Sequence, residues 1–226
     1  LFNFGTPETN ISFSPQAWWK LNDQNAITDY SGNGNTGTNN GATDISSGVA
    51  VTPSWKIPSA LTIPTINYTT ALDFVDTPGD KIEITSPSSS MQPTTTLTLS
   101  FWANFKQDAN WMLSNGGWGQ SSSAYSGYSI QTYNGRSLKF WIGNGTASGS
   151  FTTGASVFNL NQWHHILITY DSGTAILYID GNVVSWSGTG GINSIAYSAS
   201  YNPIFGSVNL GGAAQNAYEG LLSNAA

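Results

Sequence analysis

One stretch of ten residues decides the fold class: Thr96-Leu-Thr-Leu-Ser-Phe-Trp-Ala-Asn-Phe105. Apolar side chains recur there at every second position, and the positions between them carry Thr98, Ser100, Trp102 and Asn104. Since successive side chains of a strand point to opposite faces, this period of two predicts a β-strand with one face in a core. Residues 137–143 repeat the pattern, with Lys139 and Trp141 on the polar side.

The same pattern recurs along the chain, whereas no window has apolar residues at helical spacing. Clusters of Gly, Asn, Asp, Pro and Ser separate the patterned segments, and Asp180-Gly181-Asn182 has the composition of a hairpin turn. About a dozen short strands at this spacing predict an all-β fold, an antiparallel two-sheet jelly-roll β-sandwich. The further strands are expected at residues 17–21, 71–75, 81–85, 111–114, 128–133, 164–170, 175–180 and 183–186, with a last pair around 204–211.

The composition excludes several classes of protein. Only 8% of the 226 residues are charged and the net charge is −6, against about 25% charged residues in an average globular protein. Scattered cations do not form a phosphate-binding groove, so no nucleic-acid partner is expected. No apolar run is long enough to span a bilayer, so membrane insertion is not expected either. The chain has no cysteine, which excludes disulfides and thiolate metal sites.

The chain is interpreted as one domain with a short leader. Residues 1–16 are expected to form an extended leader and residues 17–226 the sandwich. Two long irregular stretches, residues 29–64 and 115–127, are expected to be functional or disordered loops. The uncharged polar composition and the start on Leu1 favour a piece of a larger polypeptide or assembly on an extracellular, cell or virion surface.

Several motifs carry a family resemblance. Residues 17–23 read Ala-Trp-Trp-Lys-Leu-Asn-Asp, and residues 29–35 read Asp-Tyr-Ser-Gly-Asn-Gly-Asn. The most specific motif is Asn-Gln-Trp-His-His-Ile-Leu-Ile-Thr-Tyr-Asp at 161–171, which leads into Ala-Ile-Leu-Tyr-Ile-Asp-Gly at 175–181. Further matching segments are Ala-Leu-Asp-Phe at 71–74, Gly-Asp-Lys-Ile-Glu-Ile at 79–84 and Leu-Thr-Leu-Ser-Phe-Trp-Ala at 97–103.

Over residues 17–224 the chain therefore resembles the laminin-G-like, concanavalin A-like jelly-roll family of bacterial or phage extracellular type. The resemblance implies that fold and a binding or adhesion role. The family usually closes with a strand after a glycine, and residues 218–226 stop part-way through such a segment. The domain is therefore expected to be incomplete at its C-terminal strand.

Catalytic residues are not expected. Hydrolysis of a glycan needs paired carboxylates, and glycosidases of this fold place them at alternating positions of one strand. The three glutamates, Glu8, Glu83 and Glu219, have no such spacing. The two histidines, His164 and His165, open a strand of the family, where one ring is expected inside with a hydrogen bond to backbone. The protein is therefore predicted not to be an enzyme.

The family resemblance makes calcium a candidate ligand. The candidate ligands are Asp29 with Asn33, and Asp76 with Asp80, because calcium prefers clustered oxygen atoms. The other interpretation is that Asp and Asn side chains stabilise turns by bonding to nearby backbone. No cofactor is required, and Ca²⁺ stays a candidate ligand.

Aromatic side chains give the candidate binding site. Sugar recognition uses flat rings against the apolar faces of pyranoses, together with amide groups for the hydroxyls. The competing interpretation is that these rings form a second core beneath long loops. The predicted ligand-binding residues are Trp111, Asn115, Trp118, Gln120, Tyr125, Tyr128 and Trp141, with Trp102, Asn104 and Lys139 at related positions.

Two functions stay open. The first is a non-catalytic binding or adhesion domain that recognises glycans on an extracellular or virion surface. The alternative is a structural module of a phage virion, tail or surface filament, in which the aromatic residues contact neighbouring protein subunits. Because jelly rolls host many unrelated functions, the fold alone does not decide between them.

Overall fold

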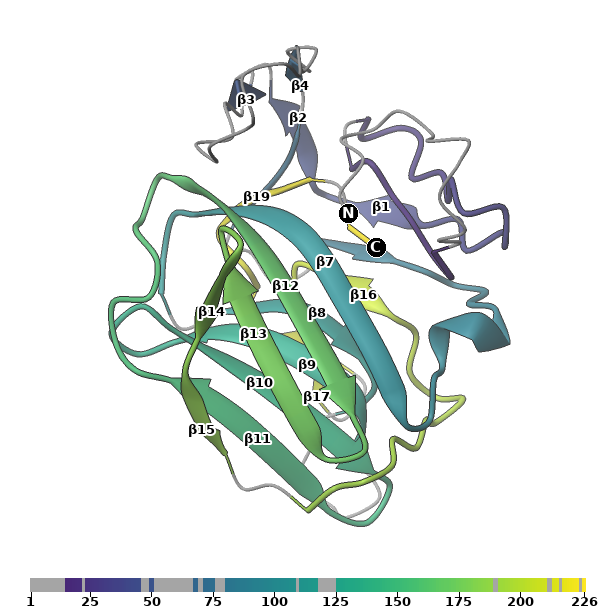
Figure 1. Cartoon of the computed structure of the whole chain (residues 1–226). Helices are drawn as coiled ribbons and strands as arrows, with labels where there is room; N and C mark the ends of the chain where they lie inside the picture. The colour runs from purple at the N-terminus through teal and green to yellow at the C-terminus, as the bar shows by residue number, and fades with distance from the viewer. Residues whose placement is uncertain are drawn as a thin grey trace, which may run out of the picture.

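Two antiparallel sheets packed face to face form the molecule (Figure 1). The computed structural model describes residues 15–21, 23–45, 49–50, 67–68, 71–75, 80–108, 110–117, 125–188, 191–210, 213–215, 217–223 and 225–226. The eight-stranded sheet consists, in spatial order, of β1 (Thr38–Asn40), β6 (Lys81–Glu83), β16 (Ile204–Phe205), β8 (Trp111–Asn115), β9 (Ser126–Tyr133), β10 (Ser137–Asn144), β11 (Ser148–Thr153) and β15 (Trp186–Gly188).

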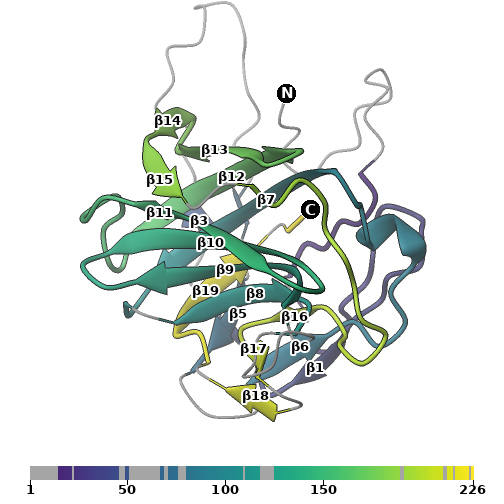
Figure 2. The same cartoon turned by 90° about the horizontal axis from the view of Figure 1, so that it is seen from below.

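The seven-stranded sheet lies over the first and completes the sandwich (Figure 2). Its spatial order is β14 (Asn182–Val184), β13 (Thr174–Ile179), β12 (Trp163–Asp171), β7 (Thr96–Phe105), β19 (Gly220–Ser223), β5 (Ala71–Phe74) and β2 (Thr43–Ile45). The smaller elements are the strand pairs β3 (Val49–Ala50) with β4 (Asn67–Tyr68) and β17 (Val208–Leu210) with β18 (Ala213–Gln215), and the 3₁₀ helix η1 (Ser89–Met91). No helix within the described residues is long and apolar enough to cross a membrane.

The core lies between the sheets, and the period of two explains it. Every second residue of β7, from Leu97 to Phe105, is buried, as the sequence predicts. Strand β10 contributes Leu138, Phe140 and Ile142 from the opposite sheet. The rings of Phe140 and Tyr170 meet across the sandwich at 6.4 Å between centroids. Each such side chain contributes about 1.5–3 kcal/mol to stability through burial. The two antiparallel sheets with this core between them confirm the predicted jelly-roll sandwich.

The predicted strand at residues 17–21 is not formed. Trp19 makes only isolated bridges, one with Asp29 and one with Ala225. Leu21 has a φ of 52°, which an extended chain does not adopt. This backbone conformation ends the pairing after Trp19, although both side chains are buried in the core.

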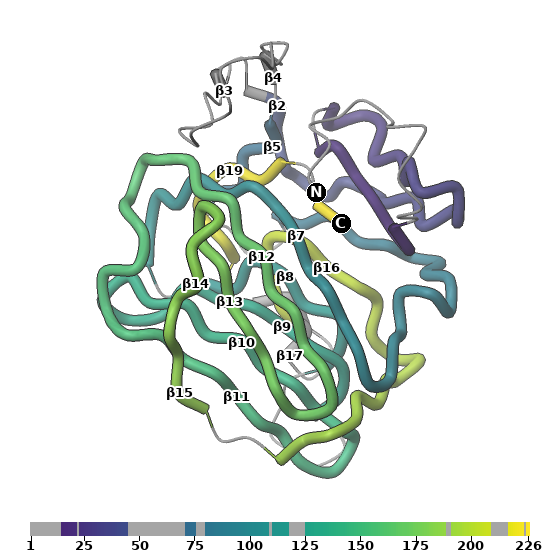
Figure 3. Tube along the Cα trace, in the orientation of Figure 1, coloured from purple at the N-terminus to yellow at the C-terminus, as the bar shows by residue number. Residues whose placement is uncertain are grey.

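The predicted strand at residues 183–186 is divided between the two sheets. Strand β14 pairs with β13, whereas β15 pairs with β11 and forms the edge of the eight-stranded sheet. Figure 3 follows the chain along this side of the sandwich. The Trp186 ring stacks on Phe140 at an interplanar angle of 10° and donates from Nε1 to the carbonyl of Ala175. Packing of this ring favours the passage to the second sheet.

Some strands were not predicted. Strand β11 carries one large apolar residue, Phe151, among Ser, Gly and Thr, so its composition resembles a loop. Strands β1 and β2 lie within the expected loop at residues 29–64. Strand β19 pairs with β5 on one side and β7 on the other. The domain boundaries stay a prediction.

Candidate functional site

The side of the eight-stranded sheet that faces away from the core, here called the outer face, gathers polar and aromatic side chains. Because Leu138 and Phe140 point into the core, Lys139 and Trp141 lie on the outer face. The register extends this face over four neighbouring strands. One row consists of Trp111, Gln131, Lys139 and Thr152, and the next of Ser114, Ser129, Trp141 and Ser150.

Lys139 lies against two aromatic rings of this face. Its Nζ is 4.0 Å from the ring centroid of Trp141 and 4.9 Å from that of Tyr133. Burial lowers the pKa of the Lys139 ammonium from its ordinary value. Within the described residues Lys139 makes no ion pair, whereas Lys81 and Lys106 each contact a carboxylate. One ring face of Trp141 therefore carries a cation.

Trp111 stands at one side of the outer face, next to a bulge. The register with β9 shifts between Trp111 and Leu113, and such bulges redirect side chains. Trp111 is half-buried and lies opposite the largely buried Gln131. The Oγ of Ser129, in the same face, is buried without a hydrogen-bond partner among the described residues.

A segment that sequence reasoning missed lies at one end of the eight-stranded sheet. Ala196 accepts a hydrogen bond from the N–H of Gly127 and donates one to the carbonyl of Gly143. A Cβ built on Gly143 would lie 2.5 Å from the backbone of Tyr125, so only glycine fits there. A Cβ on Gly117 would clash with the ring of Tyr201. Residues 195–201 thus pack against the first residues of β9 and the last residues of β10.

The structure places the predicted site residues in different parts of the sandwich. Trp111 and Trp141 lie together on the outer face, and Tyr125 is half-buried just before β9. Trp118 and Gln120 lie outside the described residues. Trp102 lies on the seven-stranded sheet, where its ring is 5.2 Å from that of His165, so the fold does not bring it to Trp141.

Asn115 and Tyr128 lie in the interior instead of on the outer face. Their exposed fractions are 1% and 5%. The Asn115 amide donates to the carbonyl of Met91 at 2.8 Å and to the Tyr128 hydroxyl at 3.3 Å. Burial raises the pKa of Tyr128 to about 12. Both side chains therefore fasten η1 to the sheet, which matches the second-core interpretation.

The two histidines are structural. His164 is buried, its Nε2 accepts the N–H of Asn159 at 3.1 Å, and its Nδ1 contacts Asp180 at 2.7 Å. This confirms the expected inward ring bonded to backbone. His165 Nε2 lies 3.0 Å from the Ser100 hydroxyl, and burial lowers the pKa of His165 to about 4.

The candidate calcium ligands are engaged in turns. Burial alone would raise the pKa of Asp29, but hydrogen bonds from Ser31, Asn35 and Trp18 outweigh it, so the pKa is lowered. The Asn33 amide donates to the backbone carbonyl of Gln16.

The second candidate pair offers no stronger calcium site. Asp80 accepts the N–H of Val75, and Asp76 lies outside the described residues. No cluster of three or more His, Cys, Asp or Glu occurs in the part of the chain that is described. These contacts favour turn stabilisation, and calcium binding stays a prediction.

Glu83 does not have the environment of a general acid. Its two oxygens accept hydrogen bonds from Lys81 at 2.8 Å and Asn202 at 2.7 Å. These bonds hold its pKa below the ordinary value, whereas a general acid needs a raised pKa. Glu219 lies beside Gln107, and Glu8 lies outside the described residues.

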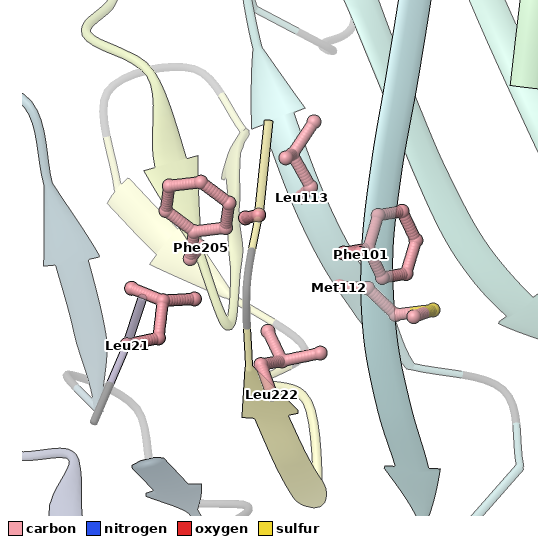
Figure 4. A pocket seen from close by; sticks show the side chains of 7 residues that line it. Leu21, Phe101, Met112, Leu113, Phe205 and Leu222 are labelled. Atoms are coloured by element: carbon pink, nitrogen blue, oxygen red, sulfur yellow. The ribbon is translucent and has the colours of Figure 1, made fainter. Parts of the chain in front are cut away.

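A small pocket between the sheets is also unsuited to a polar ligand. Figure 4 shows that its labelled side chains are all apolar. A sugar would leave its hydroxyl groups without partners there, at a cost of several kcal/mol. The pocket is a packing gap in the core, lined by Leu21, Phe101, Met112, Leu113, Phe205, Leu222 and Ala225.

Comparison with known proteins agrees with this architecture. The family model of the concanavalin A-like lectin/glucanases superfamily matches residues 76–226. No curated protein sequence matches the chain. Domain 4 of AbnA, an extracellular arabinanase of Geobacillus stearothermophilus solved with arabinotriose, has a TM-score of 0.58 at 16% identity, with 93% of this chain and 89% of that chain covered.

Two further solved structures share the fold. The CBM40 of Ruminococcus gnavus IT-sialidase, bound to α2,3-sialyllactose, has a TM-score of 0.53 at 10% identity, over 69% of this chain and 87% of that one. The binding domain of botulinum neurotoxin serotype G has a TM-score of 0.58 at 15% identity, over 93% of this chain and 46% of that one. At these identities the likeness shows the fold alone.

Proposed function

Because this chain belongs to the concanavalin A-like lectin/glucanases superfamily, we propose that it is a non-catalytic glycan-binding domain whose ligand lies on the outer face of the eight-stranded sheet. The observation that carries the proposal is the placement of Trp111, Gln131 and Trp141 on three consecutive strands of that face, in two adjacent rows of the register. Rings, an amide and neighbouring hydroxyls are the groups that sugar recognition needs.

The solved structures of similar fold support the same class of ligand. AbnA domain 4 is in complex with arabinotriose and the CBM40 with sialyllactose. The role without catalysis rests on Glu83, whose two oxygens are held by Lys81 and Asn202. An extracellular, cell-surface or virion-surface location fits a glycan ligand and belongs to the proposal.

A glycan array with the purified chain tests this function. We expect wild-type protein to retain at least one class of glycan, and Trp111→Ala and Trp141→Ala to lose it. Tyr30→Ala is the matched control, because Tyr30 is an exposed aromatic residue that lies outside the strands and contacts Trp18 with a tilted ring. Retention of binding by both tryptophan variants would contradict the proposed surface.

A second candidate function is favoured by the opposite side of the sandwich. Val183 is 66% exposed and Ile176 41% exposed on the seven-stranded sheet. Val183, Tyr178 and Leu167 lie in one row across β14, β13 and β12. Exposed apolar surface of this kind marks protein contacts, so this face could instead join a second copy of the chain in an assembly.

Analytical ultracentrifugation distinguishes this candidate from the first. Ordered self-association that the double variant Ile176→Thr/Val183→Thr abolishes, together with an empty glycan array, would favour the structural module. A monomer that binds glycans would support the binding domain.

A further inference from the structure

The cations of this chain divide into paired and unpaired ones. Lys81 contacts Glu83 at 2.8 Å and Lys106 contacts Asp73 at 2.7 Å. Two other lysines lie over aromatic rings instead: Lys20 is 4.3 Å from the Tyr30 ring centroid, and Lys139 is 4.0 Å from that of Trp141. Within the described part of the chain, neither of these two makes an ion pair.

Of these two lysines, Lys139 is the one on the outer face. Its Cα partners are Gln131 on β9 and Thr152 on β11, so an amide and a hydroxyl stand beside the ammonium. Tyr133 and Trp141 lie against its Nζ, and burial lowers its pKa. The ring contacts attract the cation to the aromatic faces, but they leave the charge without a counter-ion among the described residues.

No acidic side chain in the described part of the chain forms an ion pair with this lysine. Glu83 shares the face, but four strand spacings separate β6 from β10, roughly 19 Å. That distance exceeds the Debye length of about 8 Å at physiological salt. Asp108, near the β9–β10 turn, accepts the N–H of Arg136. The ammonium therefore offers its N–H donors among uncharged neighbours of the outer face, with Gln131 and Thr152 beside it in register and Trp141 two residues along its strand.

We propose that the outer face is specific for acidic glycans, with the carboxylate of a uronic or sialic acid residue bound by Lys139. This inference rests on the proposed glycan-binding function and deepens it. A carboxylate would make a charge-assisted hydrogen bond to Nζ, which is about twice as strong as a neutral one. Gln131 and Thr152 would orient the same sugar through its hydroxyls.

Paired polysaccharides test the specificity. The probes are polygalacturonate, hyaluronan and polysialic acid, each beside a carboxyl-reduced preparation of the same polymer. We expect at least one acidic probe to bind, and its carboxyl-reduced form to bind at least about tenfold more weakly in titration calorimetry. Equal affinity for both forms would overturn the acidic specificity while the glycan-binding function stands.

Variants assign the effect to the lysine. Lys139→Met keeps the aliphatic stem and removes the charge, so it should abolish the preference for the acidic form. Lys139→Arg keeps the charge and should retain the preference. Lys20→Met is the matched control, because Lys20 also lies over aromatic rings, and it should bind as wild type does.

The remaining outcomes are also decisive. Binding of neutral glycans with no acidic probe retained would overturn the inference alone. Failure of every acidic and neutral probe would overturn the proposed function itself. A preference that persists in folded Lys139→Met, checked by circular dichroism, would place the carboxylate elsewhere and contradict the role of Lys139.

Discussion

The ammonium of Lys139 lies 4.0 Å from the ring centroid of Trp141, two residues further along the same strand. The two side chains meet because residues i and i+2 of a strand point to one face. The contact changes what Trp141 offers to a ligand. A bare indole would serve as a stacking platform, whereas this one carries a charge at its surface.

Replacing Trp141 with alanine should weaken glycan binding more than replacing it with the smaller ring of phenylalanine. In Trp141→Ala, Lys139 loses its main support and the ligand loses apolar surface, so affinity should fall at least about tenfold. Trp141→Phe keeps a ring under Nζ and should retain most of the affinity. Titration calorimetry measures both, and equal losses in the two variants would show that the ring contact is unimportant.

Asn115→Ala should lower stability and leave the outer face intact. The buried Asn115 amide satisfies the carbonyl of Met91, and a buried group left without its partner costs about 1–3 kcal/mol. Chemical denaturation should show that loss, while the folded fraction binds glycan with wild-type affinity. Normal stability with lost binding would instead place Asn115 in the binding site.

Stability should fall in mildly acidic solution because of His165. Its pKa in the folded protein is about 4, below the ordinary value of about 6.5. The unfolded chain therefore binds more protons between these two values, so the free energy of unfolding decreases as the pH falls from about 6.5 to 4. The shift corresponds to at most about 3 kcal/mol.

His165→Gln removes this titration and should flatten that part of the pH profile. Denaturation at several pH values measures the difference between the variant and wild type. Asp180 acts at lower pH: burial opposes its ionisation, but hydrogen bonds from His164 and His165 lower its pKa, so its contribution is lost only as the pH falls below about 4. An equally steep decline in His165→Gln between pH 6.5 and 4 would contradict the assignment.

Gly143→Ala should destabilise the end of the outer face. Its Cβ would lie 2.5 Å from the backbone of Tyr125, and such overpacking costs about 1–3 kcal/mol. Gly154→Ala is the control, because a Cβ at Gly154 meets no atom within 4 Å. Thermal unfolding of both variants checks this, and equal stability of the two would show that the strand ends can separate without cost.

A local signal could have identified more of the site. Asn134-Gly135 has the composition of a hairpin turn, and Gly135 has a φ of 77°. The turn fixes the register of β9 against β10, which puts Gln131 opposite Lys139. Gln131 is therefore within reach of sequence reasoning, although its residue type is a weaker sign of sugar binding than an aromatic ring.

The sequence by itself determined the sandwich, because the period of two in β7 and β10 reports directly which side chains share a face. It also determined the inward ring of His164, since the strand pattern places that residue among core positions. These features depend on residues close together along the chain.

Only the tertiary structure decided which aromatic residues share a surface. Trp102 and Trp141 have the same polar-side position in their strands, yet the fold places them on opposite sheets. Asn115 is buried against η1 and bonds to the buried Tyr128, and Ala196 bonds to the ends of β9 and β10. Periodicity fixes the orientation of a side chain within its own strand, whereas its neighbours and its exposure depend on segments far away in the sequence.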